Sequence, residues 1–264
     1  MSAPLAAGRD RLGHLDAQAL LALWEAGVGQ PASAREDSLL RATSSGGEPP
    51  NALGERNAQL LGLHARLFGN AIDLLSHCPG CGAAAQFTGD CEALSATGAD
   101  CADCANRPAG SAGGPIRIET AGYSVEFRLP DANDIAAVSH ASGDSSEDEF
   151  AHRLLARCVL SSNCEGRQVP VDELPEPVVD ALSREMEALD PRAALSFAVA
   201  CPQCGVHWDA PLDLGRLVWQ KVQAAAERLL LDVDTLARTY GWTESEVLRL
   251  SPTRRAAYLQ LAAA

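Results

Sequence analysis

Two five-residue motifs carry the most specific chemistry in this 264-residue chain, and each holds two cysteines separated by two residues. They are Cys-Pro-Gly-Cys-Gly at 78–82 and Cys-Pro-Gln-Cys-Gly at 201–205. Structural Zn²⁺ is commonly held by a tetrahedron of four thiolates. Each motif can supply two thiolates from one tight turn, because proline restricts the backbone and the final glycine tolerates a positive φ. The motifs predict one structural zinc site with the ligands Cys78, Cys81, Cys201 and Cys204.

A further cysteine pair, Cys101 and Cys104, offers a competing set of ligands. Combined with Cys78 and Cys81 it would make a local site of ordinary zinc spacing. This pair lacks the proline and the trailing glycine that the matched motifs share. Closing the long loop between the matched motifs adds little cost, because loop entropy grows only logarithmically with length. We therefore favour the distant set and keep Cys101 and Cys104 as alternative metal ligands.

The sequence favours a structural ion over a catalytic one, because four thiolates leave no open position for water or substrate. His77 and His207 adjoin the motifs and could each replace a sulfur or lie beside the site. Elsewhere we find no phosphate-binding glycine loop, no nucleophile elbow and no metal-binding histidine pair on a helix. The sequence therefore predicts that the protein is not an enzyme.

The charge of the chain argues against nucleic acid as a partner. Its formal net charge is −14, and Lys221 is the single lysine. Binding to nucleic acid depends on clustered basic side chains that displace counterions. No apolar run is long enough to cross a bilayer, and no secretory leader opens the sequence. We expect a cytoplasmic protein whose partner is neither nucleic acid nor a membrane.

The pattern of helices, then strands, then helices predicts an α+β fold. Helical periodicity is clearest at 55–68, 175–189 and 212–240, and alternation predicts a hairpin at 116–129. Short strands should follow both cysteine motifs and form a small zinc-ribbon-like sheet. The predicted parts are a flexible tail (1–14), a helical N-terminal subdomain (15–69), an α+β zinc-ribbon-like body (70–210) and a helical C-terminal region (211–264). The body would carry a flexible insertion at about 89–114, which is rich in Gly, Ala and Asp.

The segment 236–250 is similar to the two helices and glycine turn of a helix-turn-helix. Its second helix would carry Glu244 and Glu246, which suit a protein partner better than DNA. A zinc-ribbon nucleic-acid-binding or transcription accessory protein stays the alternative function.

Short landmarks spread over the chain carry a resemblance to a known family. Besides the two cysteine motifs they are Trp24-Glu25, Gln30-Pro31, Gly54, Arg56-Asn57, Leu60-Leu61, Phe127-Arg128-Leu129-Pro130, Arg157-Cys158-Val159, Trp208, Trp219, Leu236-Ala237, Tyr240-Gly241-Trp242, Glu244, Leu248, Leu250, Arg254-Arg255 and Tyr258-Leu259. In their order and spacing the chain resembles the baseplate hub assembly chaperone family of T-even-type phages and related contractile injection systems.

The resemblance implies a non-enzymatic factor that helps to build, or forms part of, the baseplate of a phage-tail-like particle. Its partners would be baseplate, hub or spike proteins. The resemblance favours the distant cysteine set, and the segment 89–114 is the main departure from the family pattern. Aromatic and arginine side chains dominate interface energetics, so the candidate contact residues are Trp242, Arg254, Arg255 and Tyr258. Aromatic residues at helical spacing more often belong to the core, so Arg254 and Arg255 are the better surface candidates.

Overall fold

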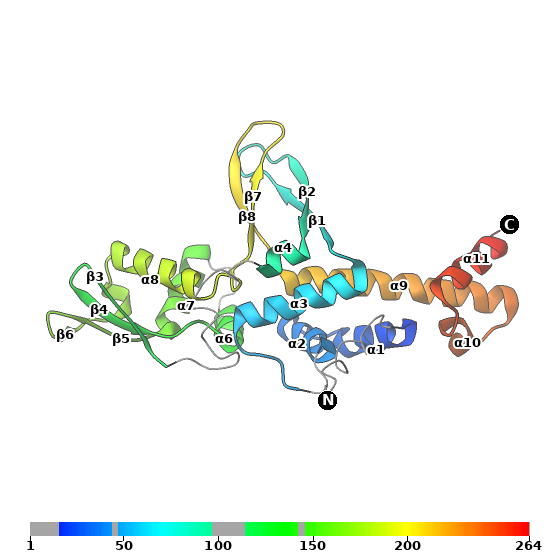
Figure 1. Cartoon of the computed structure of the whole chain (residues 1–264), viewed down its shortest axis with the longest axis horizontal. Coiled ribbons are helices and arrows are strands. Elements are labelled where there is room, and N and C mark those ends of the chain that lie inside the picture. The colour runs from blue at the N-terminus through cyan, green and yellow to red at the C-terminus, as the bar shows by residue number, and fades with distance from the viewer. Residues whose placement is uncertain (1–15, 44–46, 97–113, 142–145, 264) are drawn as a thin grey trace, which may run out of the picture. The chain divides into compact units, whose positions relative to one another are not determined.

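The computed structural model describes residues 16–43, 47–96, 114–141 and 146–263 (Figure 1). The predicted tail at 1–14 lies outside the described residues, as do Cys101 and Cys104. The chain forms two compact units, each assembled from separate stretches of sequence. The helical unit takes in 1–47, 62–70 and 214–264, so far as these are described, and the mixed unit takes in 48–61 and 71–213.

The helical unit is organised around one long helix. Its elements are α1 (Ala17–Gly27), α2 (Ala32–Thr43), the second half of α3 (Leu53–Phe68), α9 (Leu214–Tyr240), α10 (Glu244–Leu248) and α11 (Pro252–Ala262). Helix α9 packs against α1, α2, α10 and α11. Its buried residues recur at helical spacing, among them Val218, Val222 and Leu229. The helices predicted at the two ends of the chain therefore belong largely to one unit.

Residues of types that favour helix starts stand at the N-termini of α1, α10 and α11. The Asp16 carboxylate accepts a hydrogen bond from the Ala19 amide at 2.8 Å and begins α1. Thr243 and Glu246 form a capping box at the start of α10. Ser251 caps α11, and Pro252 occupies its first turn. Side-chain oxygens here satisfy amides that have no partner inside the helix.

The mixed unit contains three antiparallel sheets, which confirms the α+β class. Two are hairpins: β1 (Ala71–His77) with β2 (Ala84–Asp90), and β7 (Ser196–Ala200) with β8 (His207–Pro211). The third has the order β3 (Ile116–Thr120), β4 (Tyr123–Phe127), β5 (Val159–Cys164) and β6 (Arg167–Gln168). Its other elements are α4 (Cys91–Ala96), α6 (Ala132–Ala141), α7 (Glu147–Cys158), the 3₁₀ helix η1 (Val171–Glu173) and α8 (Glu176–Leu189).

The four-stranded sheet and helix α8 share a hydrophobic core. Val125 and Phe127 alternate along β4 and are fully buried. They pack with Val178 and Leu182, which lie one turn apart on α8. Apolar residues recur at every second position in β4 and four positions apart in α8. Each element therefore has one apolar face, and these two faces pack together.

One predicted boundary needs correction, and one strand lies where the sequence analysis predicts none. The insertion expected from residue 89 begins too early, because β2 continues to Asp90 and α4 follows to Ala96. The register explains this, since Ala71 pairs with Asp90 and the strands of the hairpin match in length. Short strands are predicted after both cysteine motifs, but β1 precedes the first motif. The second helix of the helix-turn-helix-like segment, α10, spans only Glu244–Leu248.

The length and hydrophobicity of the helices decide whether any of them could cross a membrane. In the part of the chain that the structure describes, no helix has both the length and the apolar surface needed to span a lipid bilayer.

A buried carboxylate joins three elements of the mixed unit. Asp134, on α6, has a side chain only 1% exposed. It accepts two hydrogen bonds from Arg128, at 2.5 and 2.8 Å, and one from Arg157 Nε at 2.9 Å. Burial by itself would raise its pKa, but hydrogen bonds from Arg128, the Asp131 amide and Arg157 outweigh burial and lower the pKa from 3.8 to about 2. The ion pair ties the end of β4 to α6 and α7.

We expect Asp134→Asn to lower the free energy of unfolding by about 3 kcal/mol at neutral pH, because both arginines lose their buried counter-charge. The folded pKa of Asp134 lies below its ordinary value, so this carboxylate stabilises the protein above about pH 4. That contribution, about 2 kcal/mol, is lost as the pH falls toward 2. Urea unfolding at several pH values measures both effects. Asp172→Asn, at a pair whose carboxylate is 79% exposed, is the matched control. Equal stability of the two variants would contradict this account.

Candidate metal centre

Each cysteine motif forms the turn of a hairpin in the mixed unit. The first lies between β1 and β2 and the second between β7 and β8, and Figure 1 shows the two hairpins side by side. The amide of the first cysteine closes each turn: Cys78 donates to the Ala83 carbonyl at 2.9 Å, and Cys201 donates to the Val206 carbonyl at 2.8 Å. The two turns therefore have the same backbone hydrogen bonding.

The glycine that ends each motif is required by the backbone. Gly82 has φ of 73° and Gly205 has φ of 72°, a region that side chains with a Cβ disfavour. In this conformation their amides donate to the carbonyls of Cys78 at 2.8 Å and Cys201 at 3.0 Å. The turn then bends back, and the second cysteine of each motif comes beside the first.

The four sulfur atoms meet at the ends of the hairpins. Cys78 Sγ lies 3.5 Å from Cys204 Sγ, and Cys81 Sγ lies 3.6 Å from Cys201 Sγ. All four sulfurs lie within 4.8 Å of one another. A tetrahedral ion with metal–sulfur bonds of about 2.3 Å would hold its ligands roughly 3.8 Å apart, whereas a disulfide needs about 2.05 Å. The donor set fits a tetrahedral metal ion, and the four cysteines are free thiols.

Backbone amides point at the sulfurs and change their acidity. Gly80 N donates to Cys78 Sγ and Gln203 N to Cys201 Sγ, each at 3.4 Å. Hydrogen bonds from the amides of Cys204 and Gln203 lower the pKa of the Cys201 thiol from 9.0 to about 6. The Val206 amide acts in the same direction on Cys204, but contacts with the sulfurs of Cys78 and Cys201 outweigh it and raise the Cys204 pKa to about 12. A bound cation would favour the thiolate form of all four, because metal binding displaces their protons.

An aromatic cluster packs the two hairpins against each other beside the sulfurs. The rings of Phe87 and Phe197 lie 5.4 Å apart at 60°. They pack with Trp208 against a buried cluster of Ala85, Val199 and Ala210. The Trp208 indole donates to Ser76 Oγ at 3.3 Å and so links β8 to β1. These contacts align the two turns that present the cysteines.

The sulfur cluster is buried on one side and open on the other. Cys78 and Cys201 are 2% and 4% exposed, whereas Cys81 and Cys204 are exposed. His77 and His207 are exposed strand residues, and within the described ranges the only group able to hold a metal ion jointly is the set of four cysteines. The neighbouring Val206 is 38% exposed, although it is apolar.

The remaining described cysteines lie elsewhere. Cys158 is 1% exposed at the end of α7, and burial raises its pKa to about 11, so its thiol is unreactive at neutral pH. Cys91 is buried in α4, and Cys164 is half-buried in β5. The alternative ligands Cys101 and Cys104 lie outside the described residues.

The four candidate contact residues of the C-terminal region have different surroundings. Arg255 donates to the Asp232 carboxylate at 3.1 Å, and its side chain is only 14% exposed. Trp242 stacks on Tyr240 with centroids 4.9 Å apart and meets the Tyr258 ring edge-on at 4.8 Å. Arg254 is exposed. Three of the four thus make contacts inside the helical unit, and Arg254 is the one directed at solvent.

Together, fold and site define an α+β protein in which two hairpin turns bring four cysteines into a geometry compatible with a metal ion. No family model, no curated protein and no solved structure matches the chain. Its function therefore has to be argued from its own residues.

We expect the metal-free protein to bind Co²⁺ as a spectroscopic probe, with the thiolate charge-transfer and tetrahedral ligand-field absorption of a four-sulfur site. Cys81→Ser with Cys204→Ser should abolish these bands, whereas Cys164→Ser should keep them. Protons compete with the metal for the thiolates, so the apparent affinity should fall as the pH is lowered. An unchanged spectrum in the double variant would refute the assignment.

Proposed function

We propose that the protein is a non-enzymatic assembly factor or structural component of the baseplate or hub of a phage-tail-like contractile particle, held together by one structural Zn²⁺. The observation that carries the zinc part of this proposal is the closed cluster of four sulfurs. The resemblance in sequence carries the baseplate part.

Zinc suits this site better than the other common metals. Thiolates select soft or borderline ions, and tetrahedral sulfur sites belong mainly to zinc and iron. With four protein ligands the ion has no position left for a substrate, so its role is to hold the two hairpins together. The ligands come in pairs whose members are 120 and 126 residues apart, which makes the ion a long-range crosslink.

Several of the landmark residues that carry the resemblance hold distant segments of the mixed unit together. The Gly54 amide donates to the Asp190 carboxylate at 3.0 Å. The Asn57 side chain donates to the carbonyls of Arg192 at 2.7 Å and Ala193 at 3.2 Å. Arg128 holds the buried Asp134. The proposal therefore assigns Gly54, Asn57 and Arg128 to the packing of the mixed unit and not to contacts with a partner.

Docking through the C-terminal helices centres on Arg254 in this proposal. The side chain is exposed, whereas the charge of the neighbouring Arg255 is paired with Asp232. An unpaired surface arginine offers several donors to a partner's carboxylates or carbonyls. The aromatic cluster of Tyr240, Trp242 and Tyr258 supports the helix from which Arg254 projects.

Elemental analysis should find about one zinc ion per chain in the purified protein. Cys201→Ser with Cys204→Ser should lose this zinc, and the matched variant Cys101→Ser with Cys104→Ser should retain it. Loss of zinc only in the second variant would overturn the choice of ligands. Iron in place of zinc would overturn the choice of metal.

The protein should co-purify with a hub, spike or baseplate subunit of a tail-like particle when the two are expressed together. Arg254→Glu should weaken this association about tenfold, because it reverses one interface charge without breaking the Arg255–Asp232 pair. Arg184→Glu, at an exposed arginine of α8, is the matched control and should associate normally. The thermal unfolding of both variants should equal that of the wild type. Failure to associate with any such subunit would refute the baseplate function.

A further inference from the structure

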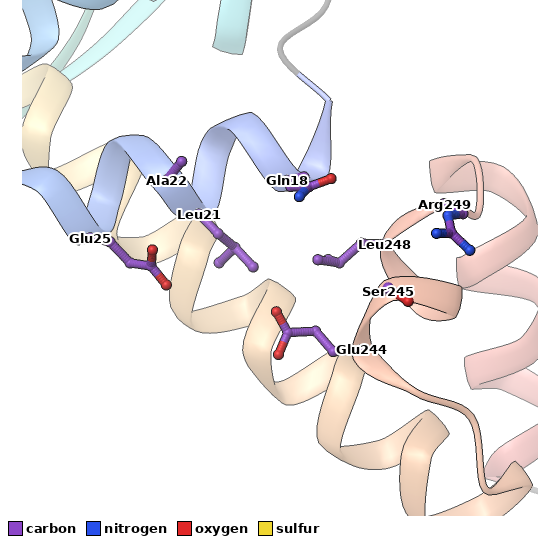
Figure 2. Close-up of a pocket in the computed structure, with 8 residues that line it drawn as sticks. All are labelled: Gln18, Leu21, Ala22, Glu25, Glu244, Ser245, Leu248 and Arg249. Atoms are coloured by element: carbon purple, nitrogen blue, oxygen red, sulfur yellow. The ribbon is translucent and has the colours of Figure 1, made fainter.

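A pocket of about 390 Å³ lies between α1 and α10 inside the helical unit (Figure 2). Leu21 and Leu248 form its apolar floor, Ala22 also lines it, and Gln18 and Ser245 add polar groups. Since a water molecule occupies about 30 Å³ in the liquid, the pocket has room for roughly a dozen waters. Water over a partly apolar floor is released at little cost when an apolar side chain enters.

The floor of this pocket is held in place by the core of the helical unit. Leu21 is 5% exposed and belongs to a buried cluster with Ala226 and Leu229 of α9. Leu248 packs against the same cluster from α10. The capping box of Thr243 and Glu246 determines where α10 begins. The pocket is thus preformed, which reduces the entropy lost when a ligand binds.

The rim of the pocket carries two carboxylates from different helices. Figure 2 shows Glu25 of α1 and Glu244 of α10 on the same side of Leu21 and Leu248. Both side chains are exposed, and neither takes part in an ion pair among the residues that the structure describes. Arg249 also lines the pocket, but it lies on the side of Leu248 away from both carboxylates (Figure 2). This side of the rim is therefore negative.

We propose that the pocket is the docking site for a basic segment of a partner protein. An aliphatic side chain of that segment would lie over the floor of Leu21 and Leu248, and a neighbouring lysine or arginine would lie between Glu25 and Glu244. The net charge of −14 attracts such a partner over a distance and repels a second copy of this chain. The proposal does not depend on the metal ion or on a tail-like particle, because it rests on the helical unit alone.

The test uses the full-length protein and a fluorescent, helical model peptide of leucine and lysine, with binding followed by fluorescence anisotropy at low salt. A peptide with glutamate in place of every lysine is the first control. Three protein variants are compared with the wild type: Glu25→Gln with Glu244→Gln, Ala22→Arg, and Glu176→Gln with Glu187→Gln. The last pair lies exposed on α8 in the mixed unit and removes the same net charge, so it separates a local effect from the general attraction.

We expect the wild type to bind the lysine peptide and not the glutamate peptide. Glu25→Gln with Glu244→Gln should weaken binding about tenfold, the size expected for two exposed charge contacts. Ala22→Arg should abolish binding, because the larger side chain occupies the pocket and its positive charge repels the lysine peptide, whereas the α8 variant should bind within about twofold of the wild type. Equal losses in the two double variants, or wild-type binding by Ala22→Arg, would overturn the proposal. So would a wild-type dimer that Ala22→Arg dissociates, since the occupant would then be a second copy.

Discussion

The meeting of four sulfur atoms at the ends of two hairpins is the constraint on which the mixed unit depends. Cys81 and Cys201 are 120 residues apart in sequence, and their sulfurs lie 3.6 Å apart. The four-stranded sheet and helices α6, α7 and α8 all lie in the loop that this contact closes. Four crowded thiols cannot all ionise without a counter-charge, so a cation bound there would stabilise the folded hairpins, and the folded hairpins would favour its binding. The folding of the two hairpins and their affinity for a metal ion would therefore be thermodynamically linked.

Buried charged groups elsewhere in the structure also lie beside groups of opposite charge. Asp134 is buried only because Arg128 and Arg157 both donate to it. Arg255 is largely covered because Asp232 lies beside it. Most other acidic groups are left to the surface of a chain whose net charge is −14. An acidic chain selects its partners by charge, and this is why the pocket between α1 and α10 suits a basic segment.

Some features of the fold could be predicted because they depend on residues close together in sequence. The caps at Asp16, Thr243 and Ser251, and the tight turns of both cysteine motifs, follow from local hydrogen bonding and backbone sterics. The sequence does not predict strand β1, because Leu74 and Leu75 are adjacent and both apolar. They interrupt the alternation of apolar and polar residues that is typical of a strand. In the structure Leu74 is half-buried, whereas Leu75 is 59% exposed. Pairing with β2, not the sequence of β1 itself, decides which side chain faces inward.

The sequence by itself determined the four-sulfur chemistry, the class of fold and the acidic character of the protein, since these depend on residue types and short spacings. Tertiary structure alone decided which distant groups meet. It brought Cys78 beside Cys204, gave Asp134 its two arginines, and paired Arg255 with Asp232 while leaving Arg254 exposed. It also opened a pocket between α1 and α10, more than two hundred residues apart in sequence. No local pattern encodes such contacts, because each depends on how elements pack once hydrophobic faces are buried.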